Sequence, residues 1–171
     1  VANLVGAEND GWRVANVTLS FERGTGFVGE LLDTTNVFRE LIEMAKSTMR
    51  NGSTVWNDDS IRREVGIIGA DLDALWAFTK RNVSQGARGG LVMGSGSGFK
   101  VAFATTQHRL GDLALRVLDR ASLSMDDLGG QPTGELVHSK LHAFAISLGG
   151  GTTQIQQNII AERVLGLPRE R

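Results

Sequence analysis

The chain has 171 residues, the usual size of one domain and long enough to bury a large core. Its formal net charge of −1 argues against nucleic acid or an anionic membrane surface as a partner. Cysteine is absent, which excludes disulfides and thiolate chemistry. No apolar run approaches the roughly 18 residues of a membrane span, and no signal-peptide pattern is present. We therefore expect a cytoplasmic chain, and its opening without Met favours a piece of a longer polypeptide.

Apolar residues recur every three or four positions over residues 10–50, which predicts one long first helix. The Asn-Gly-Ser sequence at 51–53 is a stop signal for it. A second helix is expected over residues 58–83, with Asp58 or Asp59 capping its free backbone amides.

The second half of the chain predicts three further helices and no clear strand. Residues 85–98 contain six glycines and two serines, so we expect a flexible connection there. Helices are expected at 99–121, 135–148 and 152–165, separated by a loop at 122–134 and by three glycines. Only the first few residues could form a strand. Helices with one apolar face each must pack on one another, which predicts an all-α, up-down bundle of the four-helix type.

Three consecutive glycines precede the last predicted helix. Gly149, Gly150 and Gly151 would let a ligand approach the backbone, and the helix start can hold an anion or a polar cofactor edge. The alternative is a flexible turn with Thr152 as N-cap, and the spacing alone favours this turn.

Three histidines raise the question of a metal site. His138 and His142 lie four residues apart and would share one helix face. Ser139 stands where a zinc-protease motif has Glu, and neither His108 nor another residue is an evident third ligand. We expect no metal and interpret the histidines as solvated or bonded to amides.

A Glu-Arg pair precedes a second group of glycines. Glu22 and Arg23 are followed by glycines at 24, 26 and 29, which cost helix stability but give room to a ligand. A carboxylate in such a place can act as a general base. A surface or interface ion pair is the alternative, and the residues alone favour it.

The two ends of the chain resemble one known family. Residues 150–163 read Gly-Gly-Thr-Thr-Gln-Ile-Gln-Gln-Asn-Ile-Ile-Ala-Glu-Arg, similar to the terminal helix of acyl-CoA dehydrogenases with its Gly-Thr-x-x-Ile-Gln core. Residues 5–12, Val-Gly-Ala-Glu-Asn-Asp-Gly-Trp, resemble that family's passage from its β-domain into the first long helix. The resemblance implies that residues 1–9 end a β-domain and that residues 10–171 form the C-terminal helical bundle.

The resemblance also implies a reaction, the FAD-dependent α,β-dehydrogenation of an acyl-CoA thioester. The family's commoner catalytic Glu directly precedes the Gly-Thr pair, where this chain has Gly150. In the isovaleryl and long-chain branches the base instead lies early in the first helix and precedes an Arg, which Glu22 and Arg23 match. The resemblance thus makes Glu22 the base and Arg23 an orienting residue. The positions that match flavin contacts are Gly151, Thr152 and Gln154.

The partners implied are the acyl-CoA substrate, the family's N-terminal and β-domains, electron-transfer flavoprotein as acceptor, and further subunits in a homo- or hetero-oligomer, dimer or tetramer. Residues 46–53 lack the Phe-Gly pair with which many members contact flavin across a subunit interface, and residues 129–131 only faintly resemble the family's Gly-rich loop. This pattern resembles divergent actinobacterial members, some of them heteromers acting on steroid or other bulky acyl-CoAs. The alternative function is therefore a non-catalytic assembly bundle, and the chain alone should be inactive.

Overall fold

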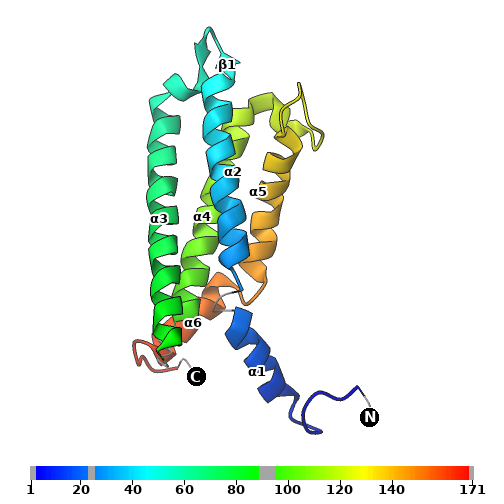
Figure 1. The fold of residues 1–171 in the computed structure, drawn as a ribbon, viewed down its shortest axis with the longest axis vertical. Coiled ribbons are helices and arrows are strands. Elements are labelled where there is room, and N and C mark those ends of the chain that lie inside the picture. Colours follow the sequence, from blue (N-terminus) through cyan, green and yellow to red (C-terminus); the bar gives the residue numbers. More distant parts are fainter. Residues whose placement is uncertain (1–2, 23–25, 89–94, 170–171) are drawn as a thin grey trace.

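The computed structural model describes residues 3–22, 26–88 and 95–169, with the side chains of residues 20–22 and 95 left out. Six α-helices occupy these ranges (Figure 1). They are α1 (Gly11–Glu22), α2 (Val28–Ser47), α3 (Asp59–Ala87), α4 (Ser95–Leu118), α5 (Thr133–Leu148) and α6 (Thr153–Arg163). A short hairpin of β1 (Met49–Arg50) and β2 (Ser53–Thr54) and two 3₁₀ turns, η1 (Val55–Asn57) and η2 (Asp119–Leu123), complete the described elements.

Helices α2, α3, α4 and α5 lie side by side along the long axis of the molecule, and each runs opposite to the next (Figure 1). Helix α6 crosses one end of this bundle, and α1 projects away from the same end. The loop between α5 and α6 therefore lies beside the start of α2. The predicted all-α bundle is confirmed.

Helix α4 is the centre of the bundle because it contacts α2, α3, α5 and α6. Its side chains are buried on several sides of the helix, among them Phe103, Leu110, Leu113 and Val117. Gly111 faces α5, where an added Cβ would lie 2.9 Å from the Cα of Lys140. A glycine at this point lets the two helix backbones come close together.

Four phenylalanine rings pack together near the end of the bundle where α4 begins. The Phe99 ring lies 5.6 Å from that of Phe103, 6.0 Å from that of Phe27 and 6.4 Å from that of Phe78, measured between centroids. The prediction that residues 95–98 belong to a flexible connection is wrong, because α4 already begins at Ser95. Burial of Phe99 among these rings offsets the cost of about 1 kcal/mol for each glycine in the first turns.

The prediction of one continuous helix over residues 10–50 is also wrong. Helix α1 ends at Glu22, Gly26 and Phe27 form a turn, and α2 begins at Val28. Closely spaced glycines at 24 and 26 weaken the helix at this point, so two separate helices form. Helix α2 ends at Ser47, and residues 51–52 make a hairpin turn instead of a simple stop. Both turn residues have positive φ, 51° at Asn51 and 81° at Gly52, as a two-residue type I′ turn requires.

The remaining helices are as predicted, apart from their ends. The second reaches Ala87, and the last two span Thr133–Leu148 and Thr153–Arg163. The helix expected at 99–121 ends earlier, because residues 119–123 form the 3₁₀ turn η2 and Asp119 takes a positive φ of 52°. Residues 3–9 contain turns and bends but no strand.

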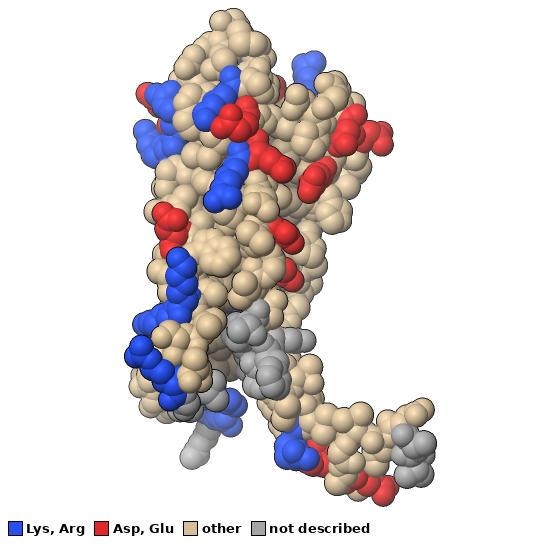
Figure 2. All heavy atoms as spheres, in the orientation of Figure 1, with Lys and Arg blue, Asp and Glu red and all other residues tan. Residues whose placement is uncertain are grey.

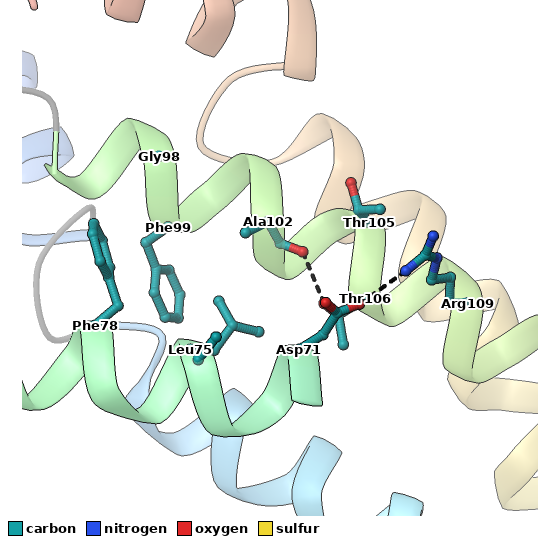
Figure 3. A pocket seen from close by; sticks show the side chains of 10 residues that line it. Asp71, Leu75, Phe78, Gly98, Phe99, Ala102, Thr105, Thr106 and Arg109 are labelled. Atoms are coloured by element: carbon teal, nitrogen blue, oxygen red, sulfur yellow. Dashed lines mark hydrogen bonds and ion pairs between the residues drawn. The ribbon is translucent and has the colours of Figure 1, made fainter. Parts of the chain in front are cut away.

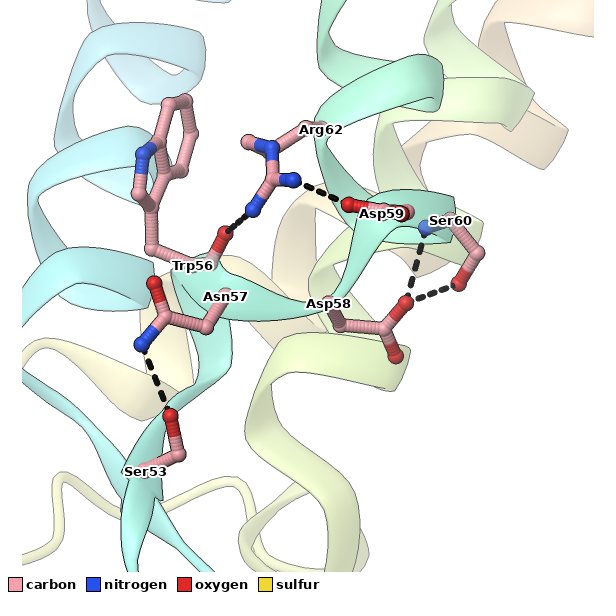
Figure 4. A network of polar contacts seen from close by, with 7 residues as sticks. All are labelled: Ser53, Trp56, Asn57, Asp58, Asp59, Ser60 and Arg62. Atoms are coloured by element: carbon pink, nitrogen blue, oxygen red, sulfur yellow. Dashed lines mark hydrogen bonds and ion pairs between the residues drawn. The ribbon is translucent and has the colours of Figure 1, made fainter.

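The expected cap of α3 is Asp58 (Figure 4). Its Oδ1 accepts hydrogen bonds from the backbone N–H of Ser60 at 2.8 Å and from the Ser60 hydroxyl at 2.6 Å. These bonds stabilise the carboxylate and lower the pKa of Asp58. Arg62 further connects the start of α3 to the 3₁₀ turn η1. It donates a hydrogen bond to the Trp56 carbonyl at 2.9 Å and forms an ion pair with Asp59.

Both signs of charge occur on the face drawn in Figure 2, where acidic side chains gather at the upper right and basic ones at the lower left of the bundle. Among the helices of the described ranges, we find none with the length and apolar character required to cross a membrane.

Candidate functional site

A hollow of about 250 Å³ lies where α2 begins and α5 ends, at the end of the bundle crossed by α6. Its walls come from the first turn of α2, the last turn of α5 and the loop that follows α5. The lining residues are Gly26, Phe27, Glu30, Ala145, Ile146, Gly149 and Gly150, and we call this hollow the glycine pocket.

The loop that closes the glycine pocket depends on two glycines in the left-handed region. Gly150 has φ of +67° and Gly151 has φ of +100°. A Cβ on Gly150 would lie 3.6 Å from Cε of Lys100 and 3.8 Å from Cζ of Phe27, in ordinary contact. A Cβ on Gly151 would lie only 2.7 Å from Nε2 of Gln156. Position 150 thus has space for a side chain beside the pocket, whereas position 151 has none.

The loop is also fixed by hydrogen bonds to α6. Nε2 of the fully buried Gln156 donates to the Gly150 carbonyl at 2.6 Å. The Thr152 hydroxyl accepts from the backbone N–H of Ile155 at 3.4 Å, which confirms Thr152 as the N-cap. The three glycines therefore form a defined turn that leads directly into the first turn of α6.

A buried lysine lies behind the glycine pocket. Lys100 is 2% exposed, and its ammonium donates to the carbonyl of Ile146 and lies 6.0 Å from the centre of the Phe27 ring. Burial lowers the pKa of Lys100, and the nearby carboxylate of Glu30 opposes this shift. Lys100 and Glu30 do not form an ion pair, because the Lys100 ammonium is hydrogen-bonded to the Ile146 carbonyl at the end of α5.

Four of the predicted site residues have described backbones near this end of the bundle. Gly151 and Thr152 lie in the loop beside the pocket, and Gln154 is exposed in the first turn of α6. Glu22 is the last residue of α1, four positions before the pocket residue Gly26, and its side chain lies outside the described part. Arg23 also lies outside the described residues.

The sequence reasoning missed three residues of the pocket region, namely Phe27, Glu30 and Lys100. A signal for Lys100 was present, because it is an isolated charge in the apolar stretch Gly-Phe-Lys-Val-Ala-Phe-Ala at 98–104. Such a charge in a core-facing stretch must be paired or hydrogen-bonded. No comparable signal marks Glu30, since an acidic residue in the first turn of a helix is common.

The histidines occupy two separate places. The rings of His138 and His142 stack at 6.2 Å and line a second hollow of about 190 Å³ between α2 and α5, which also contains carboxylates from Glu30, Asp33 and Glu135. In the described ranges, no three such side chains are placed to hold a metal ion.

His108 lies apart from this pair and bonds to α5. The Ser147 hydroxyl donates to the Ala143 carbonyl at 3.0 Å, so the bond of 2.7 Å between His108 and Ser147 requires a proton on Nε2 of the histidine. Desolvation and the ammonium of Lys140 lower the pKa of His108, while Asp112 opposes them. These contacts indicate a structural role for His108.

A third hollow, of about 450 Å³, lies between α3 and α4 (Figure 3). Leu75, Phe78 and Phe99 form its apolar wall, and Arg109 pairs with Asp71 at 3.0 Å at one end. The charges of this groove are already paired with each other. The glycine pocket, in contrast, combines the partly buried carboxylate of Glu30, exposed backbone and the start of a helix, and we take it as the candidate site.

The described part is thus an all-α bundle domain whose candidate site opens at one end of the bundle. The chain belongs to the acyl-CoA dehydrogenase family, because the sequence profile of the acyl-CoA dehydrogenase C-terminal domain matches residues 9–165. The resemblance found at the two ends of the sequence is confirmed.

Known proteins match nearly the whole chain, one by sequence and two by structure. Acyl-CoA dehydrogenase IpdE1 of Mycobacterium tuberculosis is 34% identical over 170 residues, which are 98% of this chain and 41% of IpdE1. The crystal structure of the ChsE4-ChsE5 complex from the same organism matches 99% of this chain and 44% of the solved chain, at 25% identity and a TM-score of 0.82. An FAD-dependent dehydrogenase matches 96% of the chain at 20% identity and a TM-score of 0.81. The chain therefore spans less than half the length of these relatives.

Proposed function

We propose that the chain forms the C-terminal part of an FAD-dependent acyl-CoA dehydrogenase in which Glu22 is the general base. The observation that carries the proposal is Gly150, which lines the glycine pocket where the commoner family base would stand. A glutamate there would have to adopt the φ of +67°, at a cost of about 1–2 kcal/mol. The alternative base position is filled by Glu22, which lies four residues before the pocket residue Gly26.

The residues at the start of α6 suit a polar cofactor edge. The backbone amides of Thr153 and Gln154 lie in the first turn, where the helix itself supplies no acceptor. The Gln154 side chain is exposed, and the glycines before it leave the backbone open. We infer that Gly151, Thr152 and Gln154 hold one edge of FAD. Bound FAD would supply the acceptor for the hydride from the substrate β-carbon.

Glu22 would remove the proton from the α-carbon of the thioester. A carboxylate is a weak base in water, so the substrate must displace water around it and raise its proton affinity. Arg23 would orient the carboxylate. This chain would form only part of the site. By relationship to the family, we propose that the N-terminal and β-domains form the remaining walls. On the same basis we propose electron-transfer flavoprotein as the acceptor and an oligomeric arrangement of subunits.

The decisive experiment is Glu22→Gln in the flavoprotein assembled with its N-terminal and β-domains. The flavin spectrum should stay unchanged, while the rate of flavin reduction by acyl-CoA should fall about 10²- to 10⁴-fold, as expected for a lost general base. Glu40→Gln is the matched control, because Glu40 is an exposed carboxylate of α2 outside the glycine pocket. Full activity of Glu22→Gln would contradict the assignment.

A second candidate is a non-catalytic assembly bundle in a heteromeric dehydrogenase. The relative ChsE4-ChsE5 is a complex of two named chains, and residues 46–53 of this chain end α2 and form a hairpin instead of carrying the Phe-Gly pair. On this hypothesis Glu22→Gln would leave the activity of the complex unchanged, whereas a carboxylate of the other subunit would be essential. Light scattering would show an oligomer that depends on that subunit.

A further inference from the structure

Lys100 is a buried charged side chain that the proposed reaction does not use. It lies in the second turn of α4, is almost completely closed off from solvent, and has its ammonium 6.0 Å from the centre of the Phe27 ring. A charge in such a place loses its contacts with water, and an apolar side chain of similar length would avoid that loss. The packing of the bundle alone therefore does not explain why a lysine stands at this position.

The ammonium of Lys100 caps the end of α5. It donates to the carbonyl of Ile146, the third-last residue of that helix, and the last carbonyls of a helix have no partner within it. The neighbouring carbonyl of Ala145 accepts from the backbone N–H of Gly149 at 2.8 Å. A positive charge at this end of a helix also suits the helix dipole. A side chain of α4 thus completes the hydrogen bonding at the end of α5.

The capped turn leads directly into the loop that we infer to hold an edge of FAD. The loop begins at Gly149, three residues after Ile146. Cε of Lys100 lies 3.6 Å from the place where Gly150 would carry a Cβ, so the aliphatic part of the lysine also packs behind the loop. Glycines have more backbone freedom than other residues, so a glycine loop loses more conformational entropy when a ligand fixes it. Contacts that fix the loop before the ligand arrives reduce this loss and strengthen binding.

The loop is held at both of its ends. Gln156 donates to the Gly150 carbonyl at 2.6 Å from α6, the helix that follows the loop, and Lys100 holds α5, the helix that precedes it. Resting on the proposed function, we propose that Lys100 is a positioning residue for the cofactor. Its bond to the Ile146 carbonyl keeps residues 149–152 in the conformation that receives the edge of FAD. The lysine acts through the loop and takes no part in the transfer of the proton or the hydride.

The test compares the affinity for FAD of wild type, Lys100→Met and Lys100→Arg, each assembled with its N-terminal and β-domains and freed of flavin. Methionine has nearly the length of lysine but cannot donate a hydrogen bond. The Kd for FAD of Lys100→Met should rise about 10- to 100-fold, the range for a hydrogen bond to a charged group. Lys100→Arg keeps a charged donor and should recover part of the lost affinity.

A matched control separates positioning from general stability. Val117 is as deeply buried as Lys100 and lies on the same helix, roughly 25 Å farther along its axis. Val117→Ala should lower the free energy of unfolding, measured in urea, and leave the Kd for FAD unchanged. In the flavin-free protein, the amides of residues 149–156 should exchange hydrogen faster in Lys100→Met than in wild type, and Val117→Ala should not change them.

Equal affinity for FAD in wild type and Lys100→Met would overturn the proposal, as would unchanged hydrogen exchange in residues 149–156. Equal losses of affinity in Lys100→Met and Val117→Ala would make Lys100 an ordinary core residue, and an arginine variant that binds FAD no better than the methionine variant would also contradict it. If Lys100→Met does not fold, Lys100→Gln decides, because its side chain is shorter and uncharged; unchanged affinity would again overturn the proposal. The proposed function fails separately, if no acyl-CoA reduces the flavin or if Glu22→Gln retains full activity, because FAD affinity and hydrogen exchange do not depend on turnover.

Discussion

Gly150→Ala tests the backbone geometry on which the assignment of the base depends. A residue with a Cβ loses about 1–2 kcal/mol in the left-handed region, and Gly150 has φ of +67°. Alanine also restricts the unfolded chain, which returns about 0.4–1 kcal/mol. The added Cβ meets Lys100 and Phe27 at 3.6 and 3.8 Å, so steric overlap adds nothing. We expect the free energy of unfolding to fall by about 1 kcal/mol.

Gly29→Ala is the matched control in the same region of the chain. Gly29 lies in the first turn of α2, and a Cβ there would meet nothing within 4 Å. Alanine at this position gains helix propensity of up to about 1 kcal/mol, so the free energy of unfolding should rise. The two variants make the same chemical change and should move stability in opposite directions.

Urea unfolding followed by far-ultraviolet circular dichroism measures both changes. The two midpoints should lie on either side of the wild-type midpoint, with unchanged slopes. An increase in stability for Gly150→Ala equal to that for Gly29→Ala would refute the reasoning, because position 150 would then accept an ordinary residue. The backbone argument against a glutamate at position 150 would be lost with it.

Two further predictions concern the packing of α5. Gly134→Ala should lower the free energy of unfolding by about 2 kcal/mol, because a Cβ there would lie 2.2 Å from the backbone oxygen of Met125. A decrease of less than about 0.5 kcal/mol, measured by urea unfolding, would contradict this expectation. His108 should titrate below its usual pKa of 6.5, because desolvation and then Lys140 disfavour its charged form. Its folded pKa is depressed, so its contribution to stability is present above pH 6.5 and is lost as the pH falls through the folded pKa. NMR titration of the ring measures this pKa, and a smaller loss of stability on acidification is expected for His108→Asn.

The sequence predicted the bundle because helical periodicity and caps are local properties. Spacings of three and four, the Asp58 cap and the Thr152 cap placed four of the helices with small errors at their ends. Local signals failed where glycines are dense. Glycine-rich sequence separates α1 from α2, yet residues 95–98 are helical and lead into the buried Phe99.

The sequence by itself determined the all-α class, the family and the turn before α6, since each depends on neighbouring residues or on a contiguous motif. Only the tertiary structure decided that Gly150, Glu30 and Lys100 meet at one end of the bundle. These residues come from three separate helices or loops, and their meeting depends on how α2, α4 and α5 pack. The tertiary structure also decided the hydrogen bonds of these side chains. The Lys100 ammonium donates to the carbonyl of Ile146 at the end of α5, and Oε2 of Glu30 has no donor among the described residues.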